Sequence, residues 1–103
     1  MQSFNRVQLI GTLGVDPTIN SVGENQVMNL SIATEERFKR NEEWVGETTW
    51  HIVELWNPSP SVRELKKGSN VFIEGTYKGE TYEKEGHKKY VMKVKAKKII
   101  PLA

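Results

Sequence analysis

Apolar and polar residues alternate with a period of two over most of this chain, and that alternation restricts its fold more than any other feature. Successive side chains of a β-strand point to opposite faces, so the pattern predicts strands with one buried face. Five stretches show it: RVQLIG (6–11), QVMNLSIAT (26–34), TTWHIVELWN (48–57), VFIEGTY (71–77) and KYVMKVKAK (89–97). The sequence therefore predicts an all-β protein.

Turn-forming residues separate these stretches. Residues 14–25 are typical of a loop, because they combine an Asp-Pro pair with a glycine. Residues 41–47 are interpreted as a hairpin tip. Residues 79–88 are interpreted as a second hairpin, with its turn at Glu85-Gly86.

The only helix signal is SVRELKK at 61–67. Ser61 can cap its first turn and Gly68 can end it. Pro58 and Pro60 are expected to prevent an earlier start. The predicted order is three strands, a short helix and two strands, which is the order of the five-stranded Greek-key barrel called the OB-fold. Other small barrels share this strand count, so the pattern favours the OB-fold without excluding them.

Length and composition predict a single cytoplasmic domain. The chain of 103 residues is long enough for one core, and we expect it to form one domain over residues 1–103. It has no cysteine, which fits a reducing compartment. No apolar stretch approaches the length of a membrane span, and MQSFNRVQLIG resembles neither a secretory signal nor a transit peptide.

The charge is distributed unevenly. Residues 1–77 carry 7 basic and 10 acidic residues, whereas residues 78–103 carry 8 lysines and only 3 glutamates. The basic C-terminal third is a candidate surface for a polyanion. Lysines on strands also prevent edge-to-edge aggregation, and charge alone does not separate the two interpretations.

Catalytic residues are scarce. The chain has no cysteine, one aspartate (Asp16) and two histidines, His51 and His87, which lie in different predicted elements. Nucleophile–base pairs and metal sites need such residues in convergent positions. The sequence therefore predicts a protein that is not an enzyme and holds no metal or cofactor.

The aromatic residues are more informative. In 48–57, Trp50, Glu54 and Trp56 share one face of the predicted strand, and His51 lies on the other face. Tryptophan is usually a core residue, but burying this face would also bury the charge of Glu54. Exposed rings beside basic residues suit a flexible single strand, because bases stack on the rings while lysine and arginine neutralise phosphates. The predicted stacking residues are Phe38, Trp50, Trp56 and Tyr82.

Other large residues are assigned differently. Tyr90 alternates with the apolar residues of 89–97 and is predicted to lie in the core. Trp44 is expected to be a packing or interface residue, and Phe72 is a candidate for a subunit interface.

Four motifs in order resemble the bacterial single-stranded DNA-binding protein family over nearly the whole chain. They are NRVQLIGTLGVDP (5–17), LSIATEERFK (30–39), ETTWHIVELW (47–56) and LKKGSNVFIEGTY (65–77). The resemblance implies an OB-fold that binds single-stranded DNA with little sequence preference in replication, recombination and repair, and usually a homotetramer, with a dimer as the alternative. It also implies a cytoplasmic protein associated with the nucleoid, or one of phage or plasmid origin.

The resemblance also assigns roles to residues. The family's stacking aromatics correspond to Phe38, Trp50, Trp56 and Tyr82, the set already selected. Its phosphate-contacting positions correspond to Arg6, Lys39, Arg40 and Lys67, and charge adds Lys78 of the last hairpin. His51 corresponds to a position associated with subunit contacts.

The chain departs from the family pattern in two places. The typical member continues into an acidic C-terminal tail, whereas this sequence stops at IIPLA, and WNPSPSVRELKKGS (56–69) is shorter than usual. The alternative functions are a tail-less protein-interaction adaptor on the same fold, against which the retention of all four aromatic positions argues, and an RNA-binding module, because stacking alone does not distinguish RNA from DNA.

Overall fold

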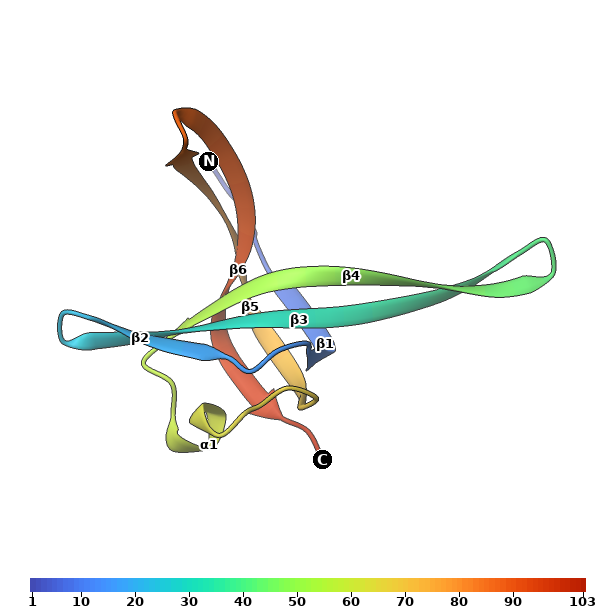
Figure 1. Ribbon diagram of the computed structural model, residues 1–103, viewed down its shortest axis with the longest axis horizontal. Helices are drawn as coiled ribbons and strands as arrows, with labels where there is room; N and C mark the ends of the chain where they lie inside the picture. The colour runs from blue at the N-terminus through green and yellow to red at the C-terminus, as the bar shows by residue number, and fades with distance from the viewer.

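The computed structural model describes residues 1–103 and contains six strands and one short helix (Figure 1). The elements are β1 (Val7–Leu13), β2 (Thr18–Val22), β3 (Asn25–Arg40), β4 (Glu43–Trp56), α1 (Pro60–Arg63), β5 (Asn70–Lys84) and β6 (His87–Pro101). The helix α1 has four residues, and no helix is long and apolar enough to cross a membrane.

Five of the strands close into a barrel. The sheet order is β1-β5-β6-β4-β3-β2, and β1 also pairs with β3 at Thr12↔Ala33 and Leu13↔Ile32, which joins the two ends of the ring. All pairs are antiparallel except β4–β6, which is parallel at Val53↔Val94 and Glu54↔Lys95. The predicted all-β OB-fold, with its short helix between the third and fourth barrel strands, is confirmed.

The core lies inside this ring and comes from the alternate residues of each strand. Met28, Ile32, Val53 and Ile73 are completely buried. Val62 of α1 belongs to the same apolar cluster, so the helix covers one end of the barrel. The alternation read from the sequence therefore identifies the buried face of every barrel strand.

Gly75 occupies a point at which β5 passes very close to β6. The pairing of the two strands shifts between Glu74 and Gly75, so β6 contributes one extra residue, Lys97, at a β-bulge. A Cβ atom at Gly75 would lie 2.1 Å from the carbonyl oxygen of Lys95 and 2.8 Å from Cα of Ala96. Only glycine lets the two backbones approach this closely.

The sequence predictions for residues 14–25 and for the start of the helix were wrong. Residues 14–25 are not entirely loop, because β2 pairs with the start of β3 around Gly23, whose φ is +62°. Every β2 residue is exposed, so this strand leaves no burial pattern in the sequence. The helix begins at Pro60, with Ser59 rather than Ser61 at the N-cap. Proline is tolerated there because the first helical N–H has no intrahelical partner.

Two hairpins extend beyond the barrel as long arms (Figure 1). The β3–β4 arm (residues 35–48) turns at Asn41 and Glu42, so residues 43–47 belong to β4 rather than to the predicted tip. The β5–β6 arm (residues 77–92) turns at Glu85 and Gly86 as predicted. Both turns place two consecutive residues at positive φ, which suits the right-handed twist of a tight hairpin.

Candidate nucleic-acid interface

Alternate residues of β4, β5 and β6 form one continuous outer face. Residues opposite each other in paired strands lie on the same side of the sheet. The pairs Glu54↔Lys95, Thr76↔Lys95 and Lys78↔Lys93 therefore connect the outer residues of all three strands. This outer face contains Trp44, Trp50, Ile52, Glu54 and Trp56 of β4, Lys78, Glu80 and Tyr82 of β5, and Lys89, Lys93 and Lys95 of β6.

Trp50 lies in the middle of the outer face and is 59% exposed. It is paired with Ala33, whose short side chain leaves its ring accessible. The ring lies against Gly14, where a Cβ atom would approach ring carbons Cζ3 and Cη2 to 2.3 and 2.5 Å. Gly14 is in turn held by a hydrogen bond from its N–H to the carbonyl of Ser31. The loop after β1 therefore supports one side of the ring and leaves the other to solvent.

This contact predicts the effect of Gly14→Ala. The added methyl group must push the Trp50 ring away from its support, since the ring carbons lie well inside contact distance. We expect the affinity for an unstructured thymidine oligonucleotide to fall by about 5- to 10-fold, which is the low end of the value of one stacked base. Fluorescence anisotropy of a labelled oligonucleotide measures it.

Gly79→Ala is the matched control, because its Cβ atom would displace the ring of Tyr90, which lies on the opposite face of the β5–β6 arm from the predicted stacking residue Tyr82. Its affinity should equal that of the wild type. Wild-type affinity in Gly14→Ala would show that the position of the Trp50 ring does not matter for binding.

Two further predicted stacking residues also lie on the outer face. Trp56 is 38% exposed at the end of β4, and it shares a shallow groove of about 290 Å³ with Lys97 and Lys98. Tyr82 is 49% exposed on the β5–β6 arm and is paired with Lys89. Each ring thus has lysines beside it, the combination that binds bases and phosphates together.

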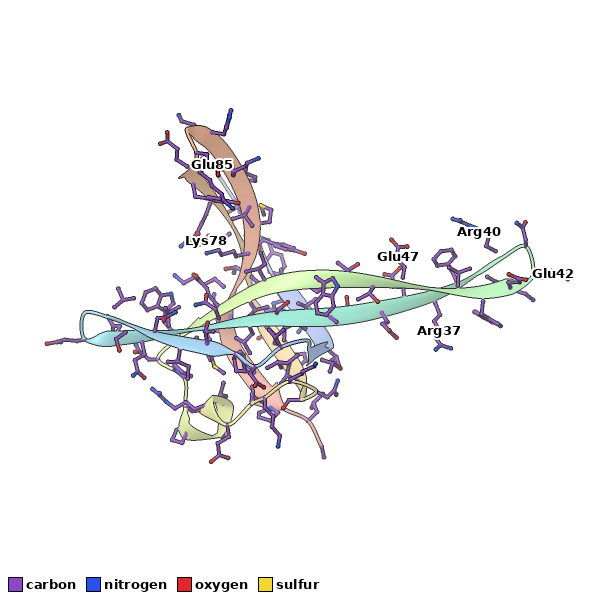
Figure 2. The ribbon with its side chains drawn as sticks, viewed as in Figure 1. Arg37, Arg40, Glu42, Glu47, Lys78 and Glu85 are labelled. Atoms are coloured by element: carbon purple, nitrogen blue, oxygen red, sulfur yellow. The ribbon has the colours of Figure 1, made fainter.

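Phe38 does not join this surface. It is paired with Val45 and belongs to the other set of alternate residues, the set that points inward in the barrel. Figure 2 shows Arg37 and Glu47 projecting from opposite sides of the β3–β4 arm, which is the same alternation seen in side chains. The half-buried Phe38 ring has the guanidinium of Arg40 5.5 Å from its centroid, a cation–π contact.

Trp44 is an outer-face residue that the sequence interpretation missed. It is 70% exposed and paired with Lys39, which places an aromatic ring and a positive charge side by side on the β3–β4 arm. The signal was available, because Trp44 precedes Trp50 by an even spacing of six residues. Treating residues 41–47 as a turn hid it.

The structure corrects the prediction that Tyr90 lies in the core, because this residue is 69% exposed. It lies on the β5–β6 arm, where β5 and β6 pair only with each other and no further strand covers the face. Its ring lies over Gly79, where a Cβ atom would overlap the phenol oxygen. The alternation is correct along β6, but the barrel that buries it ends before this residue.

The predicted phosphate-contacting residues lie at four places. Arg6 precedes β1 next to Asn5, whose side chain exchanges two 2.9 Å hydrogen bonds with the backbone of Tyr77. The backbone N–H of Lys67 donates to Asp16 Oδ1 at 2.8 Å, beside the loop that supports Trp50. Lys39 and Arg40 lie on opposite faces of the β3–β4 arm, and Lys78 lies at the base of the β5–β6 arm (Figure 2).

Glu54 is buried although it lies on the outer face, and only 6% of it is exposed. This differs from the expectation that its charge would keep the face exposed. Lys78 and Lys93 each lie 4.0 Å from it and compensate its charge. The same lysines bind Glu80, at 3.2 Å and 2.9 Å respectively. These two glutamates and two lysines form what we call the charge quartet.

Glu80 and Lys93 of the charge quartet stabilise each other's charged forms. Hydrogen bonds from Lys93 and then Lys78 lower the pKa of Glu80, and the bond to Glu80 raises the pKa of Lys93. Both shifts favour the charged forms. The ion pair therefore persists through neutral pH and is lost only when acid protonates Glu80 or strong alkali deprotonates Lys93.

His51 lies at the edge of the barrel and is half buried. Its Nε2 atom and the Thr34 hydroxyl oxygen are 2.9 Å apart and share a hydrogen bond. One ring nitrogen thus has a partner within the chain, close to the Trp50 and Ile52 surface.

Together these features define the class of protein to which the chain belongs. A closed OB-type barrel that carries exposed aromatic rings and lysines on one outer face is an oligonucleotide-binding barrel. The chain belongs to the single-strand binding protein family, whose family model matches residues 4–102.

Individual relatives agree with this assignment. The chain is similar to single-stranded DNA-binding protein 1 of Xylella fastidiosa, with 33% identity over 105 residues that cover 96% of this chain and 77% of the relative. It is similar to the mitochondrial single-stranded DNA-binding protein of Danio rerio, with 38% identity over 85 residues that cover 72% of this chain and 58% of the relative. The chain thus spans little more than half of this mitochondrial relative.

Solved structures are also similar. A Plasmodium falciparum SSB in complex with ssDNA matches with a TM-score of 0.87 and 25% identity, over 100% of this chain and 98% of that one. A deletion mutant of the Thermus aquaticus single-stranded DNA binding protein matches with a TM-score of 0.82 and 29% identity, over 97% of this chain and 51% of that one.

Proposed function

We propose that this protein binds single-stranded DNA with little sequence preference and does so without catalysing a reaction. The observation that carries the proposal is the outer face, on which Trp50, Trp56 and Tyr82 are exposed beside lysines. Every base has a flat face, so rings of this kind hold any sequence. Membership of the single-strand binding family supports the same function.

In this proposal residues 1–103 act as one binding domain that covers exposed strands during replication, recombination and repair in the cytoplasm. Stacking on Trp50, Trp56 and Tyr82 supplies the part of the affinity that does not depend on salt. Arg6, Lys39 and the outer-face lysines supply the salt-dependent part by neutralising phosphates. In this proposal Phe38 contributes only where the DNA strand also reaches the other side of the β3–β4 arm.

Tryptophan fluorescence during titration with an unstructured thymidine oligonucleotide tests this function. We expect saturable quenching that persists in part at high salt, since stacking does not release counterions. Parallel titrations with deoxyuridine and uridine oligonucleotides compare DNA with RNA, because these two differ only by the 2′-hydroxyl. Absence of quenching at low salt, in a protein shown to be folded by circular dichroism, would contradict DNA binding and favour an adaptor.

We also propose that the protein is a homo-oligomer, with a tetramer favoured over a dimer. Ile10, Phe72 and Ile100 are opposite one another on β1, β5 and β6, and they form an apolar row on the outside of the barrel. Such a row is typical of a subunit interface. His51 is the second candidate interface residue. Light scattering after size exclusion measures the mass, and a monomeric mass would contradict the proposal.

A further inference from the structure

The charge quartet lies directly between the proposed stacking residues. Glu54 is two residues before Trp56 on β4, and Glu80 is two residues before Tyr82 on β5. All four residues lie on the outer face (Figure 2 shows Lys78 at its place on β5). A DNA strand that follows the outer face from Trp56 to Tyr82 therefore passes over the charge quartet.

The charge quartet contains two negative and two positive groups, so it carries no net charge that would attract a phosphate. Lys93 is already bound to Glu80 at 2.9 Å, the distance of a charge-assisted hydrogen bond, and Lys78 lies 3.2 Å from the same carboxylate. A carboxylate in that position presents oxygen acceptors to the ammonium groups just as a phosphate does. The two lysines can therefore contribute to DNA binding only after Glu80 releases them.

The two glutamates differ in how easily they are displaced. Glu54 is buried and 4.0 Å from each lysine, so it stays in place and compensates part of their charge. Glu80 is partly exposed on the β5–β6 arm and its carboxylate can rotate into solvent. Glu80 is thus the competitor that a phosphate replaces.

We propose that Glu80, supported by Glu54, competes with DNA phosphates for Lys78 and Lys93 and so weakens binding and its salt dependence. This inference rests on the proposed single-stranded DNA binding. Its consequence is that the outer face holds a strand less tightly than its number of lysines implies, with stacking as the larger part of the affinity.

Glu80→Gln tests the proposal, because it removes the competing charge and keeps the size of the side chain. Each freed lysine that reaches a phosphate should make the plot of log affinity against log salt steeper by about 0.7. For one or two lysines, the ratio of affinities between about 50 and 200 mM salt should rise about 3- to 7-fold. Anisotropy titrations with a labelled thymidine oligonucleotide measure the slope.

Glu83→Gln is the matched control. It makes the same change in net charge on the same arm, but Glu83 forms no ion pair with a lysine. Its slope should equal the wild-type slope. Equal slopes in Glu80→Gln and Glu83→Gln, or weaker binding in Glu80→Gln, would overturn the proposal.

The double variant Glu80→Gln with Lys93→Gln completes the test, because it should return the slope toward the wild-type value. Glu80→Thr, with a residue suited to strands, repeats the measurement if Glu80→Gln melts at a lower temperature. A wild-type protein that does not bind the oligonucleotide contradicts the proposed function itself, whereas unchanged slopes in a protein that binds contradict only the competition.

Discussion

Replacing Trp50 and Trp56 together with alanine is expected to lower the affinity for a thymidine oligonucleotide by about 30-fold or more, since a stacked base contributes about 1–3 kcal/mol per ring. Each single variant should lose about 5-fold or more on the same scale. The loss should be similar at low and high salt, because the rings contribute through contact with bases and not through charge. Anisotropy of a labelled oligonucleotide measures it without relying on the tryptophans.

This loss of affinity should not come from unfolding of the protein. Both rings are exposed, and Trp50 is supported mainly by Gly14 outside the apolar core. Exposed surface substitutions change the free energy of unfolding by about 0.5 kcal/mol or less, and Trp56, which is 38% exposed, should cost more than Trp50. Tyr90→Ala, which removes an exposed ring from the opposite face of the β5–β6 arm, is the control and should bind as the wild type does. Wild-type affinity in the double tryptophan variant would remove stacking as the mechanism.

Gly75→Ala is expected to reduce the stability of the fold more than any surface substitution. Its Cβ atom would lie 2.1 Å from a carbonyl oxygen and 2.8 Å from a Cα atom, and both belong to the backbone of β6. Backbone atoms cannot move aside as a flexible side chain can, so β5 and β6 must separate. We expect a loss at the upper end of the range of about 1–3 kcal/mol that overpacking costs.

Urea unfolding at a fixed protein concentration measures this loss as a lower midpoint with an unchanged slope. Gly46→Ala is the control, since its Cβ atom meets nothing within 4 Å and its midpoint should stay close to that of the wild type. A Gly75→Ala midpoint equal to that of the wild type would show that the β5–β6 bulge relaxes at no cost.

The chemistry of the site was readable from the sequence where it depended on spacing. The even spacing of Trp50 and Trp56 placed both rings on the face opposite the buried Val53, and the structure agrees. Lys39 was assigned through the family resemblance, and the lysines of β6 were recognised only as part of the basic C-terminal third. Spacing did not reveal which of these charges are already compensated. The four compensating residues come from three different strands: Glu54, Lys78, Glu80 and Lys93.

Local pattern determined the barrel strands, their buried faces, the short helix and the turn at Glu85-Gly86, because each depends on residues close together in the chain. Only the tertiary structure decided where each alternating face stops being buried. Tyr90 continues the inward pattern of β6 but is exposed, since the arm extends beyond the strands that would cover it. The register of the β3–β4 hairpin placed Phe38 on the face opposite Trp50. Glu54 is buried against two lysines from β5 and β6, and no local stretch of the sequence contains these contacts.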